Sequence, residues 1–237
     1  MFTNEDTTNI PKLASRPLPN IENIQITVQG VTKLLQKLNT NKASGPDGIS
    51  TQFLKTTAES IALVLTYLFQ LTLDRGIIPT EWKSAHISPI FKKGNRSIAS
   101  NYRPVSLTCI CCKVIEHIVF KHIIQHLKFH NALSEAQHGF QKQKSTVTQL
   151  LLCVQDLASS IEKSTQTDAI LLDFSKAFDV VPHGRLLYKL LHYGINANIH
   201  KWLTSFLKNR TQCVRLENHS SPISAVTSGV PQGTVLG

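Results

Sequence analysis

The residues most able to do chemistry lie at positions 173–179, where an apolar run ends in an aspartate. Residues 169–172 (Ala-Ile-Leu-Leu) have the length and composition of a short strand, and Asp173 follows them directly. A carboxylate fixed at the end of a strand can hold a divalent cation, because hard cations bind to well-positioned oxygen ligands. Alternatively, Asp173 only caps the turn that follows it, as aspartates after strands often do. This stretch alone leaves both interpretations open.

The composition indicates a polyanionic partner. The 237 residues include 25 Lys and Arg against 15 Asp and Glu, which gives a formal net charge of +10. The positive excess is not confined to a tail, so we expect binding to nucleic acid rather than a disordered basic arm; a merely basic soluble protein is the alternative. The five cysteines lack paired spacing, which favours buried thiols in a reducing compartment over disulfides or a zinc site.

No segment has the pattern of a membrane span or a secretion signal. The longest apolar run, at residues 61–69, is too short to cross a bilayer. The N-terminus lacks a basic region followed by an apolar core, which a signal peptide requires. We therefore expect an intracellular protein, located in the nucleus, the cytoplasm or both.

Hydrophobic spacing predicts helices interspersed with short strands. Residues 1–20 are polar and contain three prolines, so we interpret them as a linker or an extended lead-in. The sequence Lys-Lys-Gly-Asn at 92–95 predicts a turn between two strands, and thus a β-hairpin with a basic tip. We expect helices at residues 27–38, 51–56, 59–74, 111–128, 146–162, 183–192 and 197–207, and strands at 85–91, 102–107, 169–172 and 212–217. Residues 222–227 are expected to form a last strand or a loop.

Six motifs along the chain carry a family resemblance. They are Asn-Lys-Ala-Ser-Gly-Pro-Asp-Gly-Ile (41–49), Pro-Ile-Phe-Lys-Lys-Gly (89–94), Asn-Tyr-Arg-Pro-Val-Ser-Leu (101–107), Gln-His-Gly-Phe (137–140), Asp-Phe-Ser-Lys-Ala-Phe-Asp (173–179) and Ser-Gly-Val-Pro-Gln-Gly (228–233). In this order, over about residues 20–237, the chain resembles the reverse transcriptase domain of non-LTR (LINE-type) retrotransposons. Each motif alone is weak, but six in register are specific.

The resemblance implies an RNA-directed DNA polymerase that uses two Mg²⁺ ions, with Mn²⁺ as an alternative. One ion would activate the primer hydroxyl and the other would hold the triphosphate leaving group. Asp173 matches the family's first metal-binding aspartate, and the backbone carbonyl of Phe174 would be a further ligand. The implied partners are an RNA template, a DNA primer and a deoxynucleoside triphosphate (dNTP).

The resemblance also implies contacts with the incoming dNTP. Arg103 and Lys92, with Lys93 as an alternative, would bind its phosphates, since a guanidinium offers paired donors to phosphate oxygens. Phe178 matches the family position that excludes a ribose 2′-hydroxyl, although the ring could instead belong to the core.

The glycine-containing segment at 228–233 would lie close to the new base pair. Gly229 and Gly233 allow a close backbone approach, and Gln232 would touch the base pair or the template sugar. Asp179 has no metal role by this resemblance and would stabilise its turn. The motifs at 45–48 and 138–140 can be assigned only to positions near the template path, where Lys142 and Lys144 could bind phosphates.

The resemblance implies an α+β fold of the right-hand polymerase type. Fingers at about residues 21–165 would carry the β-hairpin, and residues 166–237 would form an incomplete palm on a partial antiparallel, ferredoxin-like sheet. Together these parts would form a partial reverse transcriptase domain at residues 21–237.

The family's aromatic-x-Asp-Asp turn, which supplies the other two metal-binding aspartates, has no counterpart in the sequence. One carboxylate cannot balance two divalent cations, so we expect the chain alone not to polymerise. An RNA-dependent RNA polymerase is a rival, but the bulky Phe178 argues against it. A non-catalytic nucleic-acid-binding remnant of a mobile element is the alternative from another class.

Overall fold

The computed structural model describes residues 3, 10, 13 and 17–237. Most of the lead-in expected at residues 1–20 therefore lies outside the described residues. The chain divides into two compact units: unit 1 comprises Met1–His126 and Lys176–Gly237, and unit 2 comprises Leu127–Ser175. Of the helices that the structure describes, none is both long and apolar enough to cross a membrane.

Unit 1 begins with three helices whose ends follow from local sequence. They are α1 (Val28–Gln36), α2 (Thr51–Thr56) and α3 (Ala58–Arg75). The Thr27 side chain accepts a hydrogen bond from the backbone N–H of Gly30 and caps α1. Gly76 ends α3 in the left-handed conformation, with φ of 64°. The ends of these three helices lie within two residues of the predicted ranges.

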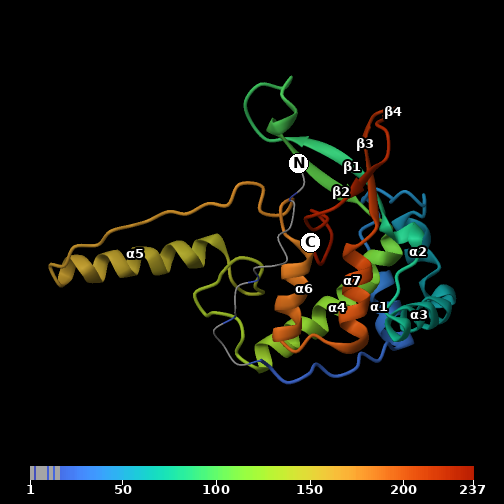
Figure 1. Cartoon of the computed structure of the whole chain (residues 1–237), viewed down its shortest axis with the longest axis horizontal. Helices are drawn as coiled ribbons and strands as arrows, with labels where there is room; N and C mark the ends of the chain where they lie inside the picture. Colours follow the sequence, from blue (N-terminus) through green and yellow to red (C-terminus); the bar gives the residue numbers. More distant parts are fainter. Residues whose placement is uncertain (1–2, 4–9, 11–12, 14–16) are drawn as a thin grey trace. The chain divides into compact units, whose positions relative to one another are not determined.

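A five-stranded sheet forms the upper part of unit 1 in Figure 1. Its strands are β1 (Ser84–Phe91), β2 (Tyr102–Leu107), β3 (Arg210–Leu216), β4 (His219–Ser220) and β5 (Ser224–Val226). The order is β2-β1-β3-β4, and β5 also pairs with β3. β1 and β2 pair antiparallel, which confirms the predicted hairpin.

The expectation of an antiparallel sheet is wrong for β1 and β3, which run parallel with Ser84 opposite Thr211. Parallel neighbours need a long crossover connection, and the chain between β2 and β3 supplies it. In unit 1 this connection includes α4 (Ile110–Phe129, whose last residues belong to unit 2), α6 (His183–His192) and α7 (Ala197–Leu207). Hydrophobic alternation predicts a strand but carries no information on the direction of its partner. The sheet is thus mixed.

Aromatic side chains fill the core below this sheet. Trp202 and Phe206 of α7 stack with ring centroids 5.7 Å apart, and Phe69 meets Trp82 edge to face at 5.8 Å. The buried indole N–H of Trp202 donates to the hydroxyl of Thr72. Two short 3₁₀ turns, Thr80–Lys83 and Ala99–Asn101, complete the regular elements. Since Trp82 lies just before β1, its contact with Phe69 packs the start of the β-hairpin against α3.

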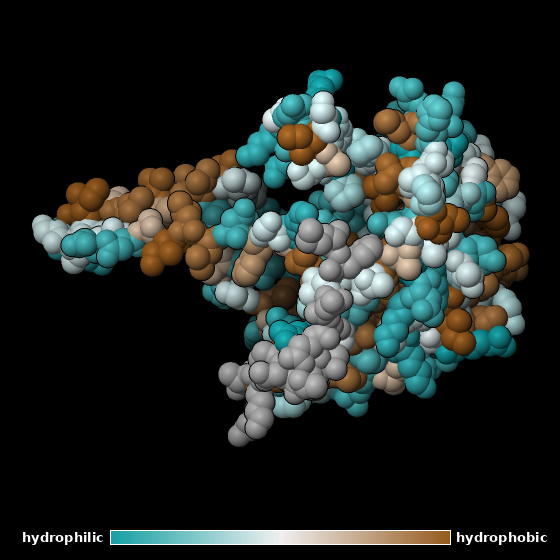
Figure 2. Space-filling model, turned by 45° about the horizontal axis from the view of Figure 1, so that its top comes forward, coloured by the Kyte–Doolittle hydropathy of each residue, from teal (hydrophilic) through white to brown (hydrophobic). Residues whose placement is uncertain are grey.

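Unit 2 contains the helix α5 (Thr146–Glu162), as predicted. The side chains of Ser145 and Thr148 each bond to the backbone N–H of the other residue and form a capping box. None of the α5 residues is buried, and Figure 2 shows the brown apolar surface that this helix presents.

The strand expected at residues 169–172 does not form, and these residues adopt no regular structure. Leu171 is 96% exposed, and its neighbours Ile170 and Leu172 are also exposed. A strand must exchange its backbone hydrogen bonds with a neighbouring strand, and no described residues of the chain pair with this run. The strand prediction at 169–172 is therefore wrong, because apolar composition favours a strand but cannot supply its partner.

Candidate functional site

A tight turn presents Phe178 in unit 1. The backbone N–H groups of Asp179 and Val180 both donate to the carbonyl of Lys176, at 2.9 and 3.2 Å. Lys176 itself adopts a left-handed φ of 52°. The backbone of Asp179, rather than its side chain, thus closes the turn.

The glycine-containing segment lies directly against this turn. The N–H of Val230 donates to the carbonyl of Phe178, and the N–H of Gly229 donates to Val181. A Cβ at Gly229 would lie 2.6 Å from the carbonyl oxygen of Asp179, so only glycine permits this approach. His183 is buried, and its Nε2 donates to the carbonyl of Gly229 at 2.7 Å.

The same segment is tied to the β-hairpin. The backbone N–H of Ser106 in β2 donates to the carbonyl of Gln232 at 2.8 Å. Gly233 follows with a left-handed φ of 92°, and a Cβ there would lie 3.1 Å from the Val105 side chain. Gln232 and Gly233 are therefore held beside β2.

The hairpin brings its own cations to this region. The N–H of Lys92 donates to the carbonyl of Asn101, which closes the end of the hairpin. The Arg96 guanidinium lies 5.0 Å from the centre of the Phe91 ring, a cation–π distance. The Tyr102 hydroxyl donates to the carbonyl of Arg96 at 2.9 Å and fixes the loop further.

Together, the hairpin, the turn and the glycine-containing segment line one cavity of about 810 Å³ in unit 1. Phe178 and Gln232 contribute to its wall, and Asp179 is the one carboxylate among its described lining residues. Four cationic side chains also line it: Lys92, Arg96, Arg103 and Lys176. A concave site with this excess of positive charge attracts a polyanion of small-molecule size.

Asp173 and Phe174, the expected metal ligands, lie in unit 2, whereas the cavity belongs to unit 1. Both residues are exposed and lie outside any helix or strand. Within the described ranges, no three His, Cys, Asp or Glu side chains are placed to share a metal ion. The structure thus brings four of the expected nucleotide-binding residues together, but it does not assemble a metal centre around Asp173.

A buried carboxylate anchors the residues that follow Gly233. Glu116 of α4 is fully buried, and its Oε2 accepts the backbone N–H groups of Val235 and Leu236 at 3.0 and 3.1 Å. Burial raises the pKa of this carboxyl, while the two backbone donors and the charge of Arg210 oppose the shift. Glu116 therefore connects the core of unit 1 to the segment beside the cavity.

The motif at residues 45–48 has a packing role in this structure. A Cβ at Gly45 would lie 2.6 Å from the backbone nitrogen of Cys109, so the loop lies directly on the chain entering α4. The Cys109 thiol donates to the carboxylate of Asp47 at 2.6 Å. The motif at 138–140 lies in unit 2, where the Phe140 ring is exposed.

Sequence reasoning missed four residues of this region: Arg96, Lys176, Glu116 and His183. A lone glutamate on the apolar face of the helix at 111–128 was the available signal for Glu116, because such a position demands a buried partner. Arg96 and Lys176 carry no comparable signal, since their place depends on how the hairpin and the turn fold.

A family model described as "Reverse transcriptase (RNA-dependent DNA polymerase)" matches residues 90–237 of the chain. This span includes the end of β1, the hairpin tip and β2, together with the turn and the glycine-containing segment. The match rests on the sequence and agrees with the motifs that converge there.

Proteins of mobile elements are similar to most of the chain. The RNA-directed DNA polymerase from mobile element jockey of Drosophila melanogaster is 32% identical over 213 residues, which are 90% of this chain and 23% of that protein. The probable RNA-directed DNA polymerase from transposon X-element of the same species is 32% identical over 209 residues. These residues are 87% of this chain and 23% of that protein. The Pol polyprotein from the type-1 retrotransposable element R2 of Popillia japonica is 28% identical over 195 residues. These residues are 82% of this chain and 26% of that protein. The chain spans about a quarter of these relatives' length.

Proposed function

Because the chain belongs to the reverse transcriptase family and is homologous to the RNA-directed DNA polymerases of non-LTR retrotransposons, we propose that its cavity binds the incoming dNTP of such a polymerase. One observation carries the proposal: Lys92, Arg103, Phe178 and Gln232 come from four separate motifs and line the same cavity. Residues from four unrelated motifs would not be expected to line one cavity by chance.

The charge of the cavity supports a triphosphate ligand. Arg103 and Lys92 are the phosphate ligands expected from the resemblance, and Arg96 and Lys176 add two further cations beside them. Hydrogen bonds from ionised donors to phosphate oxygens are stronger than neutral ones. The four side chains would share the negative charge of the triphosphate.

Phe178 would select the sugar in this arrangement. Its ring lines the cavity, and its carbonyl is bonded to the N–H of Val230, so the backbone beneath the ring cannot move away easily. A ring held in this way next to the sugar leaves little room for a 2′-hydroxyl. Gln232 and Gly233 would lie at the base pair, held by the hydrogen bond from Ser106.

The divalent ions of the family fit the chain only in part. Asp173 and the Phe174 carbonyl are oxygen donors of the kind that Mg²⁺ or Mn²⁺ takes. One carboxylate does not balance two such ions, and the described residues offer no group of three metal-binding side chains. We therefore expect no primer extension by this chain alone with Mg²⁺, an RNA template and a DNA primer, and incorporation of deoxynucleotides would contradict this.

In the same proposal, residues 21–165 act as the fingers of a right-hand polymerase and residues 166–237 as part of its palm. The mixed α+β architecture is compatible with this assignment, and the basic hairpin is the element that would reach over the triphosphate. An RNA template and a DNA primer would be the macromolecular partners.

The proposal is tested by measuring dATP binding to the whole chain by equilibrium dialysis. Arg103→Gln should weaken binding about 10- to 100-fold, because a hydrogen bond to a charged group contributes about 1.5–3 kcal/mol. Arg75→Gln is the matched control, since Arg75 is exposed at the end of α3 and outside the cavity lining. Equal affinities of the wild type and Arg103→Gln would contradict the site.

The role of Phe178 has a separate readout. Phe178→Ala should narrow the difference in affinity between dATP and ATP, because it removes the ring that excludes the 2′-hydroxyl. An unchanged ratio of the two affinities would assign Phe178 to the core instead.

A further inference from the structure

A second hollow in unit 1 lies between α1 and α4, and no residue that lines it also lines the cavity at the hairpin. Its volume is about 360 Å³. Residues of α1 and of the segment before it form one wall, and α4 forms the other with His117, Ile118, Lys121 and His122. Neither the family motifs nor the proposed dNTP site involves this hollow.

Three lysines give the hollow its charge. Lys33 lies in the last turn of α1, Lys37 is the C-cap residue of this helix, and Lys121 lines the same hollow from α4. All three side chains are exposed, and no carboxylate is among the lining residues in the part of the chain that the structure describes. Three cations from two helices with no acid between them attract a ligand with several negative charges.

Of the two histidines of the hollow, His117 adds little to this charge at neutral pH. Partial burial lowers the pKa of His117 below its usual value, so its ring is mostly neutral at pH 7. The Nδ1 of His122 donates to the carbonyl of Ile118 at 2.8 Å, which fixes the orientation of that ring on the helix. The lysines therefore supply the positive charge.

The floor between the lysines is apolar. Val31 is fully buried, and Leu34 and Ile118 are half-buried. Ile26 leads into α1, and its N–H donates to the side chain of Gln70 at 2.9 Å, which holds this edge of the hollow in place. An apolar floor below a basic rim matches a ligand that carries both apolar faces and regularly spaced charges.

We propose that this hollow binds the phosphodiester backbone of a single-stranded nucleic acid, with Lys33, Lys37 and Lys121 on successive phosphates. Sugar and base surfaces of an unpaired strand would lie on the exposed parts of Leu34 and Ile118 between the lysines. Phosphate contacts carry no sequence information, so binding has little sequence preference. The hollow thus gives unit 1 a nucleic-acid contact separate from the nucleotide cavity.

The first experiment measures the affinity of the whole chain for a fluorescent single-stranded oligonucleotide as a function of salt concentration. The variant Lys33→Gln/Lys37→Gln/Lys121→Gln should bind about tenfold more weakly or worse at about 100 mM salt. The slope of log K against log salt should fall by about 2, because each phosphate contact on a single strand contributes about 0.7.

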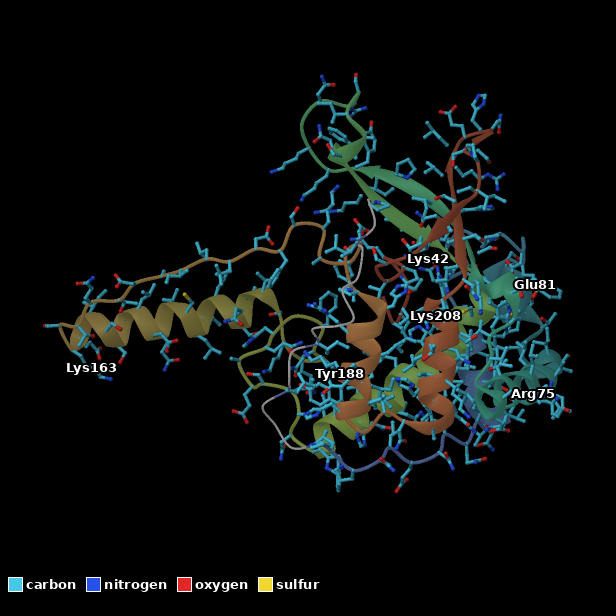
Figure 3. The ribbon with its side chains drawn as sticks, in the orientation of Figure 1. Lys42, Arg75, Glu81, Lys163, Tyr188 and Lys208 are labelled. Atoms are coloured by element: carbon cyan, nitrogen blue, oxygen red, sulfur yellow. The ribbon has the colours of Figure 1, made fainter. Side chains whose placement is uncertain are left out.

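The matched control removes the same charge elsewhere. Arg75, Lys163 and Lys208 lie on three different helix ends in Figure 3, are exposed, and line neither hollow. Their triple replacement by Gln should change the affinity less than about twofold and leave the slope unchanged. If the control weakens binding as much as the test variant, the effect is one of net charge and the proposal is wrong.

A second experiment needs no variant and so does not depend on folding of the mutants. Lysines of the wild-type chain are acylated with and without the oligonucleotide, and the modified positions are identified by mass spectrometry. The oligonucleotide should protect Lys33, Lys37 and Lys121 but not Lys163 or Lys208. Equal reaction of the first three with and without ligand would overturn the proposal.

Three ligands show whether the hollow binds RNA, DNA or only a small anion. RNA and DNA strands of one sequence are compared, and protection by either strand supports the proposal and identifies the strand that binds. Inorganic phosphate at the same phosphate concentration should not displace the oligonucleotide. Displacement by inorganic phosphate would show a small-anion site and overturn the proposal.

Discussion

Unit 1 and unit 2 contain similar apolar residues but place them differently. In unit 1, side chains such as Leu35, Phe69 and Trp202 are fully buried. In unit 2, large apolar side chains of α5, Leu150 and Leu151 among them, lie open to solvent, and no described residue of Leu127–Ser175 is buried. Helix α5 in unit 2 thus forms without burying its apolar side chains, whereas unit 1 packs such side chains into a core.

The contrast shows which elements can form without a partner. α5 makes its backbone hydrogen bonds within itself and has a capping box, so it needs no neighbour to be a helix. The run at 169–172 is equally apolar, but a strand requires a second strand for its hydrogen bonds. Exposed apolar faces in unit 2 are thus faces without a packing partner among the described residues.

The largest expected effect is that of a leucine-to-alanine substitution in unit 1, which is compared with the same substitution in unit 2. Leu54→Ala in α2 removes a side chain that is 1% exposed, and it should lower the free energy of unfolding by about 2–5 kcal/mol. Leu151→Ala in α5 removes one that is 63% exposed, and the change should stay within about 0.5 kcal/mol. Urea denaturation monitored by tryptophan fluorescence measures both, and similar losses would show that α5 packs in solution.

A smaller effect is expected when one glycine in each unit is replaced by alanine. Gly229→Ala places an alanine in a left-handed conformation, with its Cβ 2.6 Å from the carbonyl oxygen of Asp179. The free energy of unfolding should therefore fall by about 1–3 kcal/mol. Gly139→Ala in unit 2 meets no atom within 4 Å and should have almost no effect. The same denaturation measurement applies, and an unchanged stability of Gly229→Ala would mean that the close approach to the turn is absent in solution.

The smallest expected effect concerns pH. Burial raises the pKa of the Glu116 carboxyl in the folded chain, so ionisation of this group favours unfolding. Its contribution to stability is fully present below the unfolded pKa and is lost as pH rises through the raised folded pKa. Glu116→Gln removes this dependence, so the stability of the variant relative to the wild type should increase as pH rises above the ordinary glutamate pKa of 4.5.

The control for the pH prediction is Glu162→Gln, because Glu162 is exposed at the end of α5 in unit 2. Denaturation curves at several pH values give the difference between each variant and the wild type. The difference should vary with pH for Glu116→Gln and stay nearly constant for Glu162→Gln. A constant difference for both would show that Glu116 is not held in a buried site.

Local sequence predicted the elements well because their ends depend on a few neighbouring residues. α2 and α7 begin and end at the predicted residues, and Ser50 caps α2 through the N–H of Phe53. The resemblance also predicted Lys92, Arg103, Phe178 and Gln232 for one site, and all four line the same cavity. Their role in binding dNTP stays a prediction.

The features that sequence did not predict depend on distant parts of the chain. The parallel pairing of β1 with β3 and the place of Lys176 in the cavity each follow from how separate segments meet. The same holds for Glu116, which receives its two hydrogen bonds from residues about 120 positions away. Hydrophobic periodicity contains no information on these contacts, and the missing strand at 169–172 is the clearest case.

The parallel β1–β3 pair has a consequence for synthesis on the ribosome. Ser84 of β1 and Thr211 of β3 are 127 residues apart, and their hydroxyls meet across the strands. At translation rates of about 5–20 residues per second, β1 must wait on the order of ten seconds for this neighbour. During that time the nascent chain presents the hairpin with one edge of β1 unpaired, where another strand could pair with it. Slower translation through residues 108–210 should therefore increase misassembly of the nascent chain.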